Sequence, residues 1–295
     1  MNTTNPKING SVKTVEKLLD DMPKTNPAAW KVYGTIPVPD WRGFANHFQG
    51  IAPINGAVKI TGQISASASR WWCASFVEET NQSKVTDVWG TPTYDHAGGI
   101  QRLGDLLPVP LENNEGLATV AFYDVSRSPG DMPIYEVHVG GKASAVAITN
   151  YTDSAGVEQA VLLIYRYDPM KFYIYRCRVE QAGANNWVYI GETNELFSDD
   201  QFQCFSFVTQ TSAEGDIVYL LGFREDEELH LYSMNTGSDY GKLAHVKTYT
   251  GWKGSQWRYG AGLQICSSTM MRILGCSEDP SGDEDDYEFT IYFWG

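Results

Sequence analysis

The sequence is poor in basic residues and has no long apolar run. Its 295 residues contain 22 Lys and Arg against 36 Asp and Glu, which gives a formal net charge of −14 at pH 7. This charge excludes the basic footprint of a nucleic-acid-binding protein and disfavours contact with an anionic membrane. No apolar stretch is long enough to cross a bilayer, and residues 1–7 lack the basic region and apolar core of a secretory signal. We therefore expect a cytoplasmic protein that binds neither nucleic acid nor a membrane, and whose partner is a small molecule.

Several catalytic and redox motifs are also missing. The sequence has no nucleophile elbow of the form Gly-x-Ser-x-Gly, no phosphate-binding loop and no dinucleotide fingerprint. The cysteines are odd in number and none is paired in a Cys-x-x-Cys spacing, so we expect buried free thiols rather than disulfides or a zinc site. They are Cys73, Cys177, Cys204, Cys266 and Cys276.

What the sequence does contain is a segment that recurs, in diverged form, five times. The clearest copies are 47–51 (HFQGI), followed by 57–60 (AVKI), and 96–100 (HAGGI), followed by 106–109 (LLPV). Each copy opens a block of short strand-like runs separated by Gly, Pro, Asn, Asp and Ser. A repeat of roughly 40 to 60 residues made only of strands is typical of a β-propeller blade. We therefore predict a five-bladed β-propeller of the all-β class.

The two ends of the chain complete this prediction. The last block lacks an outer strand, whereas the strand-like run 30–39 has no block of its own, so we expect this N-terminal strand to complete the last blade and close the ring. Residues 11–22 have apolar side chains at helical spacing, with Ser11 as a cap, and predict one short helix. We divide the chain into an N-terminal helical extension (1–29) and a single propeller domain (30–295), with blades at about 47–91, 96–139, 142–191, 201–249 and 257–295 plus 30–39.

The starts of the inner strands, with the loops that lead into them, are expected to surround one mouth of the axial channel. Alignment of the copies places one set of residues at these starts and a second set two positions further on, and strand alternation directs both sets to the same side. We predict substrate contacts from Trp41, Arg42, Gln49, Tyr94, Lys142, Gln201, Trp257, Arg258 and Tyr259. Aromatic faces, together with Arg and the carboxylates of the same loops, suit a polyhydroxylated or aromatic small molecule.

His47 and His96 are the residues best suited to chemistry, because imidazole near pH 7 both takes and gives a proton. Asp95 or Glu195 is expected to orient them as the catalytic acid partner. We predict no cofactor; a divalent metal on His47, Gln49 and His96 is a weaker alternative, since Gln is an uncommon ligand and no third His aligns. A structural alternative, in which both imidazoles hydrogen-bond the backbone and lock adjacent blades together, stays open.

The repeat organisation over residues 30–295 resembles the five-bladed β-propellers, which include glycoside hydrolases, fructosyltransferases, tachylectin-type lectins and nucleotidases. Such a resemblance implies the fold far more strongly than an activity. Glycosidases of this shape carry two Asp and one Glu near the inner strands of successive blades, where this chain has His47, His96 and Lys142. The acids of the preceding loops form the alternative carboxylate set, namely Asp40, Asp95 and Glu195.

We expect an enzyme that acts on one small polyhydroxylated or aromatic substrate in the axial funnel by acid/base chemistry, as a hydrolase, a lyase or a cyclase. A lectin with one sugar per blade needs the same contacts in each copy, whereas the mouth positions differ between copies. A single ligand on the axis is therefore favoured. The alternatives are a non-catalytic lectin or other small-molecule-binding propeller, and a protein-interaction scaffold.

Overall fold

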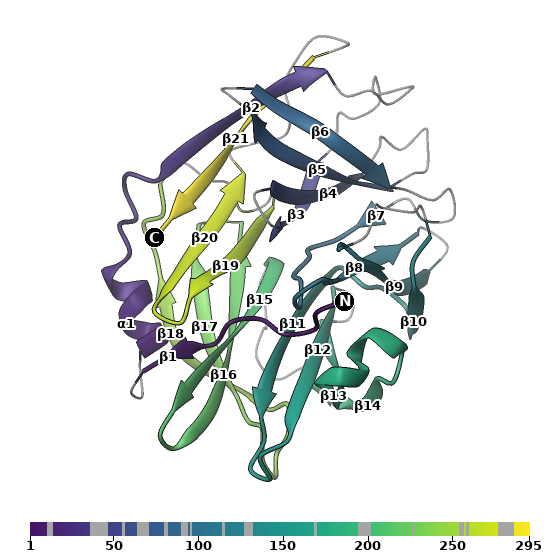
Figure 1. Cartoon of the computed structure of the whole chain (residues 1–295), viewed down its shortest axis with the longest axis vertical. Helices are drawn as coiled ribbons and strands as arrows, with labels where there is room; N and C mark the ends of the chain where they lie inside the picture. Colours follow the sequence, from purple (N-terminus) through teal and green to yellow (C-terminus); the bar gives the residue numbers. More distant parts are fainter. Residues whose placement is uncertain are drawn as a thin grey trace.

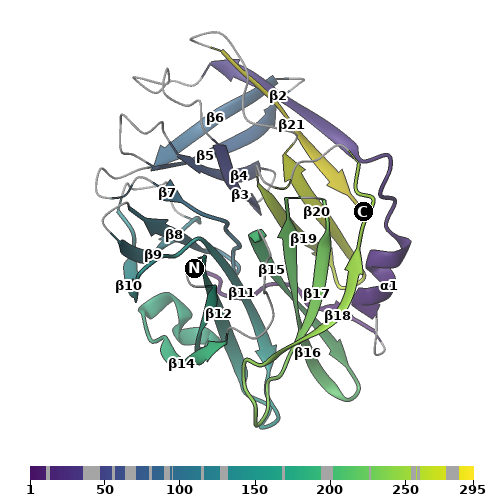
Figure 2. The same cartoon turned by 180° about the vertical axis from the view of Figure 1, so that it is seen from behind.

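The computed structural model describes most of the chain, and its described parts are built almost entirely of β-strands (Figures 1 and 2). The described residues are 1–10, 14–35, 47–54, 57–63, 71–79, 82–89, 94, 96–113, 116–126, 132–167, 170–193, 202–225, 227–253, 257, 260–276 and 286–295. No helix in this part of the chain is long and apolar enough to cross a membrane. The sheets stand around a common centre; three are formed by consecutive strands, and β1 and β2 join the other two.

The strands pair into one five-stranded and four four-stranded sheets. The first sheet contains β3 (His47–Ile54), β4 (Ala57–Gln63), β5 (Trp71–Glu79) and β6 (Gln82–Trp89). The second contains β7 (His96–Ala97), β8 (Leu106–Glu112), β9 (Leu117–Asp124) and β10 (Tyr135–Gly140). The third contains β11 (Ala145–Thr152), β12 (Glu158–Arg166), β13 (Lys171–Arg178) and β14 (Val188–Thr193), with the 3₁₀ helix η2 (Val179–Ala184) before β14.

The remaining two sheets include the N-terminal strands. The five-stranded sheet contains β15 (Phe202–Ser212), β16 (Gly215–Arg224), β17 (Leu229–Met234) and β18 (Leu243–Tyr249), with β1 (Ile8–Asn9) parallel to β15. The last contains β19 (Ala261–Ser267), β20 (Met270–Cys276), β21 (Asp286–Trp294) and β2 (Ala28–Thr35). The predicted completion of the last sheet is confirmed, because β2 pairs antiparallel with β21 along its whole length, from Ala28 opposite Phe293 to Thr35 opposite Asp286.

Burial explains the two kinds of strand pattern. The middle strand β12 is buried at every position from Ala160 to Tyr165, because sheets pack against both of its faces. Its sequence is therefore a continuous apolar run. The next strand outward, β13, alternates, with Phe172, Ile174 and Cys177 buried and the residues between them partly exposed. The main hydrophobic clusters lie between neighbouring sheets, as in face-to-face sheet packing.

The inner strand of the second sheet departs from our prediction. The repeat segment 96–100 led us to expect an inner strand that continues beyond Gly99, but β7 ends at Ala97. The cause is Pro110 in β8, whose nitrogen has no hydrogen to donate to the next position of the ladder. Gly99 instead pairs with the neighbouring sheet: its N–H donates to Ser144 O at 3.1 Å and its carbonyl accepts from Val146 N–H at 2.9 Å.

The predicted helix is present and packs on the ring. Helix α1 (Thr14–Asp21) buries Val15 and Leu19 completely, in the cluster that includes Tyr219 and Tyr249. Both views show α1 beside β18 (Figures 1 and 2). The Tyr249 hydroxyl donates to Glu16 O at 3.3 Å. The expected cap, Ser11, lies outside the described residues.

Candidate functional site

The inner strands meet closely at the centre of the ring, near the end at which they begin. We call this end the mouth. A side chain at Gly98 would lie 1.8 Å from Ser144 O, and one at Gly99 would lie 2.9 Å from Gln203 O. A side chain at Gly50 would lie 2.6 Å from Ile100 N. Only glycine permits these backbone contacts, so the centre is filled by main chain rather than by an open channel at this level.

Buried polar groups join strands that face one another across the centre. Gln101 accepts hydrogen bonds from the backbone N–H groups of Ile148 and Phe207 and donates to Phe207 O. The Cys204 thiol donates to Gln49 O at 2.9 Å and accepts from Ala261 N–H at 3.3 Å. Burial raises the pKa of this thiol to about 12, so it stays protonated and unreactive. These contacts form a fixed floor beneath the mouth.

His96 lies at the mouth against Glu112, which the sequence analysis did not identify. The two residues are opposite each other in the β7–β8 ladder, and His96 Nδ1 lies 3.1 Å from Glu112 Oε1. Nδ1 is buried and makes no hydrogen bond of good geometry, so the two side chains are in close contact without a formed hydrogen bond. The His96 side chain is 22% exposed and that of Glu112 is 11% exposed. The imidazole is therefore reachable from solvent while its carboxylate partner is nearly covered.

Glu112 also reaches the next sheet. Its Oε2 accepts a hydrogen bond from Ala143 N–H at 3.0 Å and lies 3.5 Å from Ser144 Oγ. Burial raises the pKa of Glu112, but the contacts with His96, the charge of Lys142 and the Ala143 N–H outweigh it and hold the pKa below its ordinary value. Glu112 is therefore a carboxylate at neutral pH.

The other predicted residues that the structure describes occupy different environments. Lys142 is exposed and close enough to Glu112 to influence its charge. Tyr94 is half-buried, and burial together with the charge of Glu136 raises its pKa, so its hydroxyl stays protonated. Gln49 is nearly buried.

Trp257 belongs to the hydrophobic core rather than to an open surface. Its side chain is fully buried and packs edge-on against Phe223 and Trp294, with Trp252 alongside. No face of this indole is open to a ligand.

The remaining predicted residues cannot be placed around His96. The backbone of His47 begins β3, opposite Gln63, but its side chain is outside the description. The others lie outside the described residues: Trp41, Arg42, Asp95, Glu195, Gln201, Arg258 and Tyr259. Of the predicted catalytic set, the structure therefore shows His96, together with an acid from β8. A sequence signal for Glu112 exists, because it is the charged residue that ends the apolar run 106–111.

The end of the ring opposite the mouth is covered by residues 2–10, which we call the strap. The strap crosses the ends of the inner strands, from Asp105 N–H, which donates to Asn2 O at 2.7 Å, to Ser268 O, which accepts from Asn9 N–H at 2.6 Å. Between these points, Asn5 N–H donates to Asn150 Oδ1 at 2.8 Å. The strap thus joins four of the sheets.

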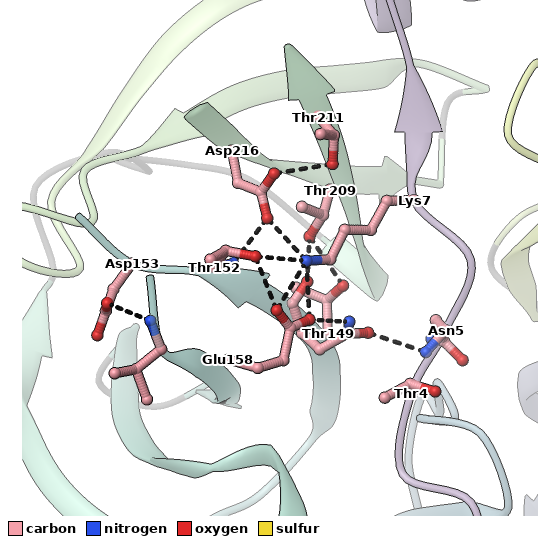
Figure 3. A network of polar contacts seen from close by, with 12 residues as sticks. Thr4, Asn5, Lys7, Thr149, Thr152, Asp153, Glu158, Thr209, Thr211 and Asp216 are labelled. Carbon is pink, nitrogen blue, oxygen red and sulfur yellow. Dashed lines mark hydrogen bonds and ion pairs between the residues drawn. The ribbon is translucent and has the colours of Figure 1, made fainter. Parts of the chain in front are cut away.

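Lys7 holds the strap through a dense polar network (Figure 3). Its ammonium lies 2.7 Å from Glu158 Oε1, 2.8 Å from Asp216 Oδ2 and 3.0 Å from Thr152 Oγ1. The Asp216 side chain is 3% exposed. Burial raises the pKa of Asp216, but hydrogen bonds from Lys7, Thr152 N–H and Thr211 outweigh it, and the net pKa is lowered. The same balance, with Lys7, Asn150 and Thr152 as donors, lowers the pKa of Glu158.

Metal-ligating side chains do not gather in the described parts of the chain: no group of three or more His, Cys, Asp or Glu is placed to hold an ion there. The described cysteines are free thiols; Cys177, Cys204 and Cys276 are buried, and Cys266 is partly exposed.

No protein-family model matches this sequence, and no curated protein matches it significantly. Solved structures do match. The catalytic domain of a GH62 α-L-arabinofuranosidase from Coprinopsis cinerea superposes with a TM-score of 0.52 and 12% identity, covering 92% of this chain and 98% of that one. The α-L-arabinofuranosidase of Podospora anserina, in complex with cellotriose, gives a TM-score of 0.49 and 13% identity over the same shares.

The protein has a β-propeller fold. At these identities the likeness extends to the fold alone. A GH43_1 enzyme from Xanthomonas citri, complexed with xylose, is similar at a TM-score of 0.46 and 11% identity, covering 88% of this chain and 90% of that one. Activity has to be argued from the residues of this propeller itself.

Proposed function

We propose that this propeller binds a small polyhydroxylated ligand at the mouth and that His96, oriented by Glu112, transfers a proton to or from it. The contact of 3.1 Å between His96 Nδ1 and the Glu112 carboxylate carries this proposal. A proton on Nδ1 faces the carboxylate, which leaves the lone pair of Nε2 for a ligand. When Nε2 takes a proton, the negative charge of Glu112 stabilises the imidazolium.

The lowered pKa of Glu112 argues against a glycosidase mechanism that uses two carboxylates. A glycosidase that uses two carboxylates needs one of them protonated, with a raised pKa, to donate to the leaving oxygen. Glu112 has a lowered pKa and does not fit that role. Acid/base chemistry centred on His96 fits hydrolysis, elimination or cyclisation, and we propose an enzyme of the hydrolase, lyase or cyclase type.

The surroundings of the pair favour a ligand rich in hydroxyl groups. Lys142 and Ser144 lie at the start of the neighbouring inner strand and supply hydrogen-bond donors next to Glu112. Gln203 adds an amide, held by Glu225 Oε1 at 2.9 Å from its Nε2. The Coprinopsis cinerea enzyme, which has the same fold, acts as an α-L-arabinofuranosidase, so a propeller of this shape accommodates sugar chemistry.

We also propose that each of the sheets is one blade. Each has a strand at the centre, two middle strands and an outer strand, and β1 is an additional strand on the sheet of β15–β18. On this proposal the molecule is a five-bladed propeller with β2 as the outer strand of its last blade.

The test is a search for binding and turnover with defined ligands. One-dimensional proton NMR of monosaccharides, uronic acids and 4-nitrophenyl glycosides reports binding as line broadening and turnover as new product signals. With a ligand found, we expect His96→Gln to abolish turnover and Glu112→Gln to lower kcat about 10²-fold with little change in KM. His138→Gln is the matched control, because His138 is exposed on the outer strand β10.

The outcomes separate the candidate functions. Turnover that survives His96→Gln contradicts the assigned role of His96. Binding without turnover in the wild type, weakened by both mouth variants, supports a non-catalytic binding propeller instead. The absence of any binding contradicts the proposal. A scaffold that uses the apolar face of α1 is disfavoured already, because Val15 and Leu19 are fully buried against the ring.

A further inference from the structure

A hollow lies away from the mouth, between the last sheet and the first. It has a volume of about 430 Å³, within the range of about 300–1,000 Å³ that small-molecule sites occupy. Its walls come from β2, β19, β20 and β21 on one side and from β3 and β4 on the other. Its lining includes Trp30, Pro53, Val58, Gln264, Arg272 and Phe293. The hollow is independent of His96 and Glu112, which do not line it.

The lining combines an apolar body with one positive charge. Of the lining residues, Val58 and Leu274 are buried and apolar, and Ala28 and Ala29 are exposed. Among the described residues of the lining, the charged side chain is Arg272 and no side chain is acidic; Gly295 lies next to Arg272. In the described part of the chain no carboxylate forms an ion pair with Arg272, although the protein carries a net charge of −14. An unpaired guanidinium in such an acidic protein is a selective position for an anion.

Arg102, which lines a neighbouring hollow, has a different environment from Arg272. A smaller hollow of about 60 Å³ shares Pro53 and Gln264 with the larger one and contains Arg102. Asn5 and Pro6 of the strap line this smaller hollow, and Arg102 Nη1 donates to Gly104 O at 2.8 Å. Arg102 is thus bound by its own chain in a space that holds little more than water, whereas Arg272 faces a space of ligand size.

We propose that the larger hollow is a second binding site, for a small molecule with an aromatic or cyclic apolar body and one carboxylate. The carboxylate pairs with the Arg272 guanidinium, which presents paired N–H donors of matching geometry. The amide of Gln264 supplies a further hydrogen bond. Trp30 and Phe293 contact the apolar body, as aromatic side chains do in small-molecule sites.

The test uses naphthalene-1-carboxylate and its uncharged counterpart, naphthalene-1-carboxamide, by isothermal titration calorimetry on the full chain. We expect the carboxylate to bind at least about tenfold more tightly than the amide. Arg272→Gln should remove this preference, and Trp30→Ala should weaken both probes. Lys31→Gln is the matched control, since it removes one positive charge from an exposed residue of β2 that does not line the hollow.

Several results would overturn the proposal. They are no binding of either probe to the wild type, equal affinities for the carboxylate and the amide, or a loss caused equally by Arg272→Gln and Lys31→Gln. Melting temperatures of the variants establish that each is folded. His96→Gln should leave the affinity for naphthalene-1-carboxylate unchanged, so failure at this site and failure of the proposed function at the mouth are distinguished.

Discussion

The two ends of the ring use charged residues in opposite ways. At the strap end, the ammonium of Lys7 is surrounded by Glu158, Asp216 and Thr152, all within 3.0 Å, and the Asp216 side chain is 3% exposed. At the mouth, the Glu112 carboxylate is satisfied on one side by Ala143 N–H and faces a partly exposed imidazole on the other.

This difference distinguishes a network that stabilises the fold from a pair of residues that is available for proton transfer. A buried charge whose partners are all supplied by the protein has no capacity left for a ligand, and removal of one partner leaves an uncompensated charge. A histidine with one nitrogen against a carboxylate and its ring reachable from solvent keeps its other nitrogen for chemistry. The comparison predicts that substitutions at the strap end reduce stability, whereas those at the mouth reduce function.

The largest effect should follow from removal of the strap. Deletion of residues 2–10 removes the Lys7 network, the links from Asp105 to Ser268, and Ile8, which is fully buried. We expect a loss of roughly 4 kcal/mol or more in the free energy of unfolding. Urea denaturation followed by far-ultraviolet circular dichroism measures it. An unchanged midpoint would show that the strap lies on the ring without stabilising it.

A single substitution at the centre of the network should have a smaller but clear effect. Lys7→Met leaves Asp216 and Glu158 without their cation and should cost about 2–3 kcal/mol. The control is Lys247→Met. Lys247 pairs with Asp20 on the surface, where both side chains are more than 40% exposed, so its loss should cost less than about 1 kcal/mol. Equal destabilisation by the two variants would contradict a special role for Lys7.

Low pH should abolish the stabilisation that the Lys7 network provides. The pKa values of Asp216 and Glu158 lie below their ordinary values of 3.8 and 4.5 in the folded protein. Their contribution is therefore complete above these ordinary values and is lost as the pH falls through the lower, folded values. We expect the stability difference between the wild type and Lys7→Met to be constant above about pH 5 and to shrink on further acidification. A difference that grows below pH 5 would reverse the assigned sign.

The smallest effect on stability should come from the mouth. Glu112→Gln keeps an oxygen that accepts from Ala143 N–H, so we expect a cost below about 1 kcal/mol. Thermal unfolding of Glu112→Gln and His96→Gln beside Lys7→Met gives the comparison directly. If the mouth variants lose as much stability as Lys7→Met, the structural alternative, in which these residues lock adjacent blades, would be favoured over a catalytic role.

The order of the strands could be predicted from the sequence because the signals that determine it are local. Apolar runs bounded by turn residues mark each strand, and sequential strands pair with one another, so the sheet β11–β12–β13–β14 follows from its own segment. The pairing of β2 with β21 is a long-range contact, yet it too was predictable, because a missing outer strand and an unassigned strand-like run required each other.

The site residues depended on contacts that the sequence does not display. His96 was predicted from its position in the repeat, but its partner Glu112 is determined by the β7–β8 register. Trp257 was placed at the mouth by alignment, whereas packing against Phe223 and Trp294 places it in the core.

By itself, the sequence determined the strand blocks, the closing strand and a histidine at the mouth, because alternation, turn residues and repeat spacing act over a few residues. Only the tertiary structure decided that the centre is filled by backbone and that Lys7 meets Asp216, 209 residues away along the chain. Such contacts arise when sheets far apart in sequence fold around one centre, and no local pattern records which charged side chains then become neighbours.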